Sequence, residues 1–358
     1  MVKLSLLNTL VSAALLVSAH PYKRASCTVD SVDSANNVAN CASITIKSFT
    51  VGSGKTITMK PANGAKITVA GTITFAKTSS EGPLFTIDGS DITFDGAGKT
   101  AFNGNGASYW DGKGTNGGVA KPHPLLKFKG SGTYSKFTVL NSPAQAVSIG
   151  NSDGLTFDGI TIDNSAGDKG ALGHNTDGFD VSADHVTIQN SVVKNQDDCI
   201  AINSGKNIIF KNNKCSGGHG ISVGSISTGK TVDTVTITGN TVSNSMYGTR
   251  IKVKASATSA SVSNVNYSGN TITGIDKYGV LISQSYPDDA GTPGTHAPIS
   301  NVNFKGDTTS VSVNSGGKRL TVDCGACSGK WDFSALKITG GKAGTIKANN
   351  AKITAGSY

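Results

Sequence analysis

Residues 174–253 carry four segments of one design: HNTDGFDV (174–181), NQDDCIAI (195–202), GGHGISV (217–223) and GTRIKV (248–253). In each segment, polar residues precede an apolar–polar–apolar triplet, and apolar residues two apart point to one face of a strand. Two residues before the triplets stand Asp177, Asp198, His219 and Thr249. The first three are equally spaced, because 198 − 177 and 219 − 198 are both 21. Equal spacing in equal register predicts successive coils of a parallel β-solenoid.

Stacked coils would bring acidic side chains together on one wall. Neighbouring strands lie about 4.8 Å apart, so Asp177, Asp198 and His219 would form a column with Asp197 beside it. Any one Asp could simply cap a corner, but three acids and a histidine in register favour acid–base chemistry. Three close carboxylates cannot all ionise without cost, so we expect at least one raised pKa. Carboxyl groups with separated pKa values suit glycoside hydrolysis, which needs a proton donor and a base or nucleophile.

The rest of the chain agrees with an all-β fold. Its 358 residues include 45 Gly and one Glu, and short alternating runs from residue 43 onward end in Gly or Asn. These residues tolerate the backbone conformations of solenoid corners. A short helix is expected within residues 28–41, where Val32, Ala35 and Val38 follow a Ser31 cap; it would cover the open end of the solenoid.

The first residues indicate secretion. Residues 1–19 have a Lys3 start, an apolar run and a Val-Ser-Ala cleavage site, which together indicate a signal peptide. Residues 20–24 end in the dibasic pair Lys23-Arg24 and are predicted to be a short propeptide of a zymogen. Residues 25–358 are then expected to form a single catalytic domain.

Six cysteines in a secreted chain favour disulfides. Six allow 15 pairings, and proximity in sequence favours Cys27–Cys41, Cys199–Cys215 and Cys324–Cys327. A metal site at the last pair is disfavoured, because no second pair lies nearby. Asn266-Tyr267-Ser268 is the one glycosylation sequon.

Charge indicates an anionic partner. The formal net charge is +9, and removing residues 1–24 takes away Lys3, Lys23 and Arg24 and leaves +6. No basic cluster is interleaved with aromatic residues as in nucleic-acid-binding proteins, so an acidic polysaccharide fits a secreted protein better. Arg250 and Lys252 flank Ile251 and would point outward beside the acids, where they could hold a substrate carboxylate.

These segments resemble the four signatures of the polygalacturonases. The matching residues are Asn-Thr-Asp (175–177), Asp-Asp (197–198), Gly-His-Gly (218–220) and Arg-Ile-Lys (250–252), and Gln-Ser-Tyr (284–286) matches a further element. The resemblance covers nearly the whole mature chain and is nearest to secreted fungal-type enzymes. It implies a right-handed parallel β-helix and endo-acting, inverting hydrolysis of α-1,4-linked galacturonic acid in pectin.

The resemblance also implies roles for single residues. Asp197 would be the general acid, Asp177 and Asp198 would activate water, and His219 would support the acid. The expected substrate-binding residues are Asn175, Arg250, Lys252 and Tyr286. In inverting enzymes acid and base stand roughly 6.5–9.5 Å apart, and we expect that range here. The need for a protonated Asp predicts an acidic pH optimum.

Further implications concern partners. No cofactor or metal is implied, and the partners expected are polygalacturonate or pectin and plant inhibitor proteins, with no nucleic acid and no membrane. We expect a monomer.

Three other functions compete with this reading. An exo-acting polygalacturonase would differ in the loops that close the groove. A pectate lyase would need Ca²⁺, which Asp177, Asp197 and Asp198 could ligate. A polysaccharide-binding β-helix would bind without releasing reducing ends.

Overall fold

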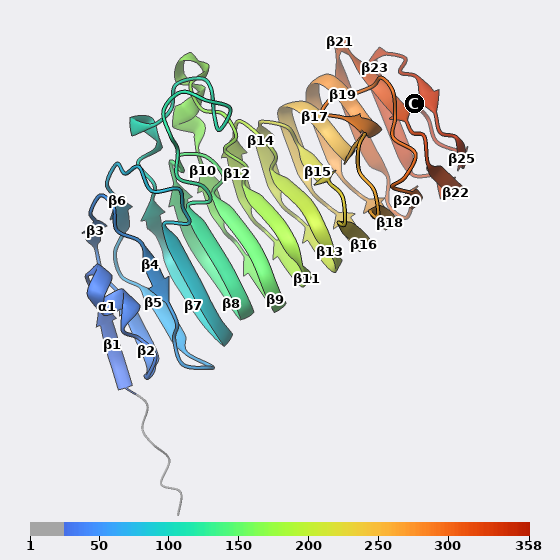
Figure 1. The fold of residues 1–358 in the computed structure, drawn as a ribbon. Coiled ribbons are helices and arrows are strands. Elements are labelled where there is room, and N and C mark those ends of the chain that lie inside the picture. Colours follow the sequence, from blue (N-terminus) through green and yellow to red (C-terminus); the bar gives the residue numbers. More distant parts are fainter. Residues whose placement is uncertain (1–24) are drawn as a thin grey trace, which may run out of the picture.

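The chain winds into a right-handed parallel β-helix. The computed structural model describes residues 25–358, so the predicted signal peptide and propeptide lie outside the described residues. Strands follow one another in coil order from β1 at one end to β25 at the other (Figure 1). Every strand pairing is parallel. The β-helical fold expected from the 21-residue spacing is confirmed.

Eight long strands turn the corners of the helix and pass from one face to the next. They are β7 Phe85–Asn103, β8 Leu126–Leu140, β9 Val147–Asp158, β11 Phe179–Gln189, β13 Ile200–Lys211, β17 Thr241–Lys254, β19 Thr271–Tyr286 and β21 Thr309–Asp323.

The other strands belong to one of three faces, as their pairings show. The first face also contains β4 Ile57–Met59, β15 Ile221–Ile226 and β24 Ile346–Lys347. The second face adds β1 Ala25–Val29, β2 Cys41–Ile46, β5 Lys66–Val69, β16 Thr231–Thr238, β18 Ser261–Ser268, β20 Ile299–Phe304, β22 Cys327–Asp332 and β25 Asn350–Thr354. The third face adds β3 Phe49–Val51, β6 Ile73–Phe75, β10 Thr161–Asp163, β12 Val192–Asn195, β14 Lys214–Gly217 and β23 Leu336–Lys342.

Helical segments are short and lie outside the sheets. Helix α1 spans Val32–Asn36, and its N-cap Ser31 accepts a hydrogen bond from the Ser34 backbone, as sequence predicts. It contacts β1 and β4. Its role as a cover for the end of the solenoid stays a prediction. Two 3₁₀ segments, Gly106–Ser108 and Ser165–Ala171, lie in loops.

The register of the first face confirms the predicted column for three coils and corrects it at the fourth. Phe179 pairs with Ile200, and Ile200 pairs with Ile221, so Asp177, Asp198 and His219 occupy equivalent positions. Ile221, however, pairs with Thr249 rather than Ile251. The residue equivalent to His219 is therefore Tyr247, not Thr249, and Thr249 is buried.

The interior combines apolar stacks with a row of buried asparagines. Aromatic rings follow one another from coil to coil, such as Phe94, Tyr134 and Phe157, with centroid distances of 5.8 and 5.4 Å. At the corner between the second and third faces, the side-chain oxygens of three buried asparagines accept hydrogen bonds from the backbone of the preceding coil. Asn213 Oδ1 accepts from Ser191 N, Asn240 Oδ1 from Asn213 N, and Asn270 Oδ1 from Asn240 N, at 2.9, 2.9 and 3.0 Å. This row satisfies backbone groups that a tight corner would leave unpaired.

Three disulfides add covalent links: Cys27–Cys41, Cys199–Cys215 and Cys324–Cys327. They are the pairs that sequence proximity favours. Within residues 25–358, no helix has the length and apolar character needed to cross a membrane.

We expect Asn240→Ala to lower the free energy of unfolding by about 2 to 4 kcal/mol, because it leaves the buried Asn213 N–H and Phe210 carbonyl without partners. Denaturant unfolding followed by circular dichroism measures this. Thr241→Ala, at the exposed neighbouring position, should change it by less than about 0.5 kcal/mol. Equal effects of the two substitutions would contradict the role given to the asparagine row.

Candidate active site

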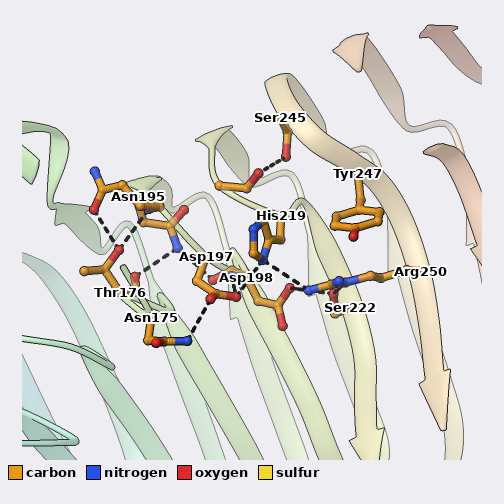
Figure 2. Close-up of polar contacts among 12 residues, drawn as sticks. Asn175, Thr176, Asn195, Asp197, Asp198, His219, Ser222, Ser245, Tyr247 and Arg250 are labelled. Atoms are coloured by element: carbon orange, nitrogen blue, oxygen red, sulfur yellow. Dashed lines mark hydrogen bonds and ion pairs between the residues drawn. The ribbon is translucent and has the colours of Figure 1, made fainter. Parts of the chain in front are cut away.

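The site lies on the first face, where β11, β13, β15 and β17 follow the corners. Asn195 fixes two of these corners, because its side-chain amide donates to the carbonyls of Thr176 (3.0 Å) and Asp198 (2.8 Å) (Figure 2). Asp177 and Asp198 therefore enter their strands at equivalent positions. His219 follows on the next coil, where its N–H donates to the Asp197 carbonyl at 2.8 Å.

Asp197 is held by two donors and by His219, and it is partly exposed. Its Oδ2 accepts from Asn175 Nδ2 at 3.1 Å, and its Oδ1 accepts from the Asp198 N–H at 2.8 Å and lies 2.9 Å from His219 Nδ1. The Asp197 side chain is 13% exposed, against 0% for Asp198. Of the two neighbouring acids, only Asp197 is thus accessible to a bound molecule.

Asp198 is a buried anion surrounded by cations. Its Oδ1 accepts from Ser222 Oγ and Arg250 Nη2, both at 2.7 Å, and its Oδ2 accepts from Lys252 Nζ at 2.5 Å. Burial opposes its ionisation, but the positive charges of Arg250 and Lys252 outweigh burial and hold the pKa of Asp198 well below its usual range. Asp198 therefore stays ionised.

The opposite holds for Asp177. Burial, together with the negative charges of Asp197, Asp180 and Asp198, raises the pKa of Asp177 well above its ordinary value. Its Oδ1 is buried and accepts no hydrogen bond from the described residues. Burial and the charge of Asp198 also raise the pKa of Asp180 to about 7. The cluster as a whole therefore retains protons at a pH where isolated aspartates would be ionised.

Asp197 and Asp198 approach each other closely, and the separation expected between acid and base stays a prediction. One oxygen of each carboxyl group and a ring nitrogen of His219 lie within 4.8 Å of one another. The two acids are adjacent in sequence, and the backbone N–H of one binds the carboxylate of the other, which draws them together.

The corrected column places an aromatic residue beside the acids. Tyr247 lies next to His219 in an edge-on arrangement, with ring centroids 5.6 Å apart (Figure 2). The Arg250 guanidinium lies 4.2 Å from the Tyr247 ring centroid. Tyr247 Oη donates to Asp289 at 2.9 Å, which anchors this ring on the loop after β19. The stack holds Arg250 in the orientation in which it binds Asp198.

Loops complete the site from both sides. Asn175 Oδ1 accepts hydrogen bonds from the Thr115 backbone N–H at 3.0 Å and from its hydroxyl at 3.3 Å, so residues 113–116 orient the amide that donates to Asp197. On the other side, Lys252 Nζ lies 5.5 Å from the ring centroid of Tyr286. The loops at residues 109–124 and 285–298 thus border the site.

All eight residues expected at the site are brought together, and others join them. Seven line one hollow of about 380 Å³, and Asp198 lies beneath it. The hollow also includes residues that the sequence analysis missed: Gln145, Asp180, Ala201, Asn203, Gly224 and Ser225. Asp180 could have been found, because it lies between the inward residues Phe179 and Val181 and so must face outward.

One oxygen each of Asp197 and Asp198 and one ring nitrogen of His219 lie close enough together to bind a metal ion. The side chains that already bind Asp198 nevertheless oppose a metal site. Both oxygens of Asp198 already bind cationic side chains. A metal ion would have to displace Arg250 or Lys252 or bear their repulsion. The residues therefore do not fit the Ca²⁺ site that the lyase alternative requires.

Asn266 lies apart from this site. It is on β18 of the second face, where its half-buried side chain accepts a hydrogen bond from Asn303 Nδ2 at 3.2 Å. Its glycosylation stays a prediction.

A family model described as glycosyl hydrolases family 28 matches residues 41–357. The chain belongs to this family. It is therefore a glycoside hydrolase, and the family expected from the four signatures is confirmed. Relatives include a polygalacturonase from Cochliobolus carbonum, 43% identical, with 96% of each chain covered. An endo-polygalacturonase from Sclerotinia sclerotiorum is 45% identical over 86% of this chain and 81% of its own length.

Solved structures agree with the fold. Endopolygalacturonase I from Stereum purpureum, solved with two galacturonate molecules, is 65% identical over 93% of this chain and 100% of its own, with a TM-score of 0.91. A polygalacturonase from Erwinia carotovora has a TM-score of 0.63 at 20% identity, covers 95% of this chain and 100% of its own, and shares the fold.

We expect Asp180→Asn to shift the alkaline limb of the pH–rate profile to lower pH. The negative charge of Asp180 helps to raise the pKa of Asp177, so its removal lowers that pKa and the cluster loses its proton earlier as pH rises. Initial rates of reducing-end release across a pH series measure this. Asp153→Asn, at an exposed position on β9, should leave the limb in place; an unshifted limb in Asp180→Asn would contradict the electrostatic account.

Proposed function

We propose that the protein is an endo-polygalacturonase that hydrolyses α-1,4 bonds between galacturonic acid residues with inversion. The observation that carries this proposal is the contrast between Asp197, accessible and held by Asn175 and His219, and Asp198, buried against Arg250 and Lys252. This contrast supports a proton donor beside a carboxylate-binding pair at one point of the groove.

Asp197 is the proposed general acid. It is the accessible member of the adjacent pair, so it can reach the oxygen of the bond to be broken. The raised pKa of Asp177 keeps a proton within the cluster. Because interacting carboxyl groups titrate together, this proton belongs to the group of acids and not to one of them alone. His219, at 2.9 Å, orients Asp197 for the transfer.

Asp177 and Asp198 are the proposed groups that activate water. Asp198 remains ionised, and Asp177 has an unpartnered oxygen that could accept a hydrogen bond from water. When the shared proton is on Asp197, Asp177 is ionised. As Asp197 protonates the leaving oxygen and the glycosidic bond breaks, water forms the new bond to the sugar and gives its proton to Asp177. Water would approach from the hollow that Asp177 and Asp180 border.

Arg250, Lys252, Tyr286 and Asn175 are the proposed substrate-binding residues. The two cations lie at the edge of the hollow and could meet the carboxylate of the sugar, as Arg and Lys do in many carboxylate sites. The Stereum purpureum relative was solved with galacturonate, which supports this substrate class.

An endo mode agrees with the first face, which continues on both sides of the site through β7–β9 and β19–β21 (Figure 1). We also propose secretion after removal of residues 1–19, processing after Lys23-Arg24, a monomeric enzyme, and recognition by plant inhibitor proteins. The three disulfides agree with an extracellular setting.

On polygalacturonate, the wild type should release saturated oligogalacturonates of mixed sizes early in the reaction, with or without chelator. Asp197→Asn should lower kcat by about 100- to 10,000-fold, because it removes the proton donor while keeping the side-chain shape. Chromatography of products and a reducing-end assay measure both, and Asp153→Asn serves as the control.

Other outcomes would identify the alternatives. Unsaturated products that absorb in the ultraviolet and disappear with chelator would indicate a lyase. A single small product from the first minutes would indicate exo action. Binding without release of reducing ends would indicate a binding protein.

A further inference from the structure

Two cation pairs lie on the first face, and their first members, Lys127 and Arg250, belong to one row. Going from strand to strand, Lys127 pairs with Ser148, Ser148 with Asp180, and Asp180 with Ala201. The row continues from Ala201 to Ser222 and then to Arg250. Lys129 follows Lys127 by two residues, as Lys252 follows Arg250, so each second cation lies one row further along its strand.

The rows between the two pairs are low. The row from Lys127 to Arg250 carries Ser148, Asp180, Ala201 and Ser222 between them, and the next row has Gly150 and Ser182, all with short side chains. A chain molecule can therefore lie on this floor, close to the backbone of the coils. The hollow of the active site includes Asp180 and Ala201, so this floor leads directly out of the site toward β8.

The lysines of the β8 pair are available to a ligand. Lys127 and Lys129 are both partly buried, and neither ammonium group makes a hydrogen bond or an ion pair within 4.0 Å among residues 25–358. Asp88 pairs with Lys129 in register on the adjacent coil but forms no such ion pair with it. The other described lysine ion pairs show that suitably placed acids on this protein do bind lysines, as Asp111 binds Lys121 at 2.8 Å.

We infer that Lys127 and Lys129 form a remote subsite that binds a carboxylate of an acidic polysaccharide whose cleaved bond lies at Asp197. The inference rests on the proposed function. Five strand spacings separate β8 from β17, which places the two cation pairs about 24 Å apart along the coil axis. Only a polyanion several sugars long can engage both pairs, so the subsite makes the enzyme favour long chains.

The remote subsite contributes through charge at a partly exposed surface. Each contact should therefore be modest, and it should weaken as salt screens it. An anchor of this kind acts on every long substrate equally in the ground and transition states, so its loss raises KM and leaves kcat nearly unchanged.

The test compares Lys127→Gln/Lys129→Gln with wild type on polygalacturonate and on the shortest oligogalacturonate that the wild type cleaves. We expect kcat/KM on the polymer to fall roughly threefold to tenfold at low salt, through KM. The oligomer should be cleaved at the wild-type rate, which also shows that the variant is folded. The difference on the polymer should shrink as ionic strength rises.

Two further variants serve as controls. Lys66→Gln/Lys211→Gln removes the same charge from the second face and should leave the polymer kinetics unchanged. Lys127→Arg/Lys129→Arg keeps the charge and should retain most of the wild-type KM.

Three results would overturn the inference: an unchanged KM on the polymer, equal losses on polymer and oligomer, or an equal loss in the second-face control. Failure of the proposed function would look different, because the wild type itself would then release no saturated products.

Discussion

The parallel hydrogen-bond ladder between successive coils is the constraint on which the rest of the structure depends. Because it holds each strand in register with the next, outward residues far apart in sequence become neighbours, as Lys127 and Arg250 belong to one row. The same register stacks apolar side chains inside and asparagines at one corner. The site is therefore built on strands, and loops add to it without having to position its acids.

This rigidity lets the protein keep an unfavourable charge arrangement. Four aspartates, Asp177, Asp180, Asp197 and Asp198, line or underlie one hollow and repel one another. Arg250 and Lys252 compensate only one of them fully, Asp198. The other three carboxyl groups repel one another and cannot all be ionised at once. At least one of the three therefore keeps its proton. Burial raises the pKa of several of these acids alike. Their pKa values therefore differ mainly because Arg250 and Lys252 pair with Asp198 and not with the other acids.

Sequence predicts the features that repeat and misses those that depend on loop length. The 21-residue spacing predicts the parallel fold and the column of Asp177, Asp198 and His219. The step from His219 to its true equivalent is 28 residues (247 − 219), and alternation continues through Thr249, Ile251 and Val253, so two registers look equally plausible. Thr249 is polar but points inward, so the alternation of polar and apolar residues does not identify Tyr247 as the equivalent of His219. Asp180 was missed because polar residues in strands usually just face solvent. The contact between the Asp198 backbone N–H and the Asp197 carboxylate was also not predicted, because it depends on the local backbone conformation rather than on the repeat.

The groove and its proposed substrate share one property, which is repetition along an axis. A surface that repeated perfectly would bind a polymer equally well in every register and would give no preferred point of cleavage. This surface departs from repetition at two places: the coils that carry the acids with Arg250 and Lys252, and the coil that carries Lys127 and Lys129. Between them the row carries the short side chains of Ser148, Asp180, Ala201 and Ser222, of which only Asp180 is ionisable. The position at which the polymer is cut then depends on where charged residues interrupt the repeat. Of these two interruptions, only the first, where Arg250 and Lys252 pair with buried Asp198, is suited to catalysis.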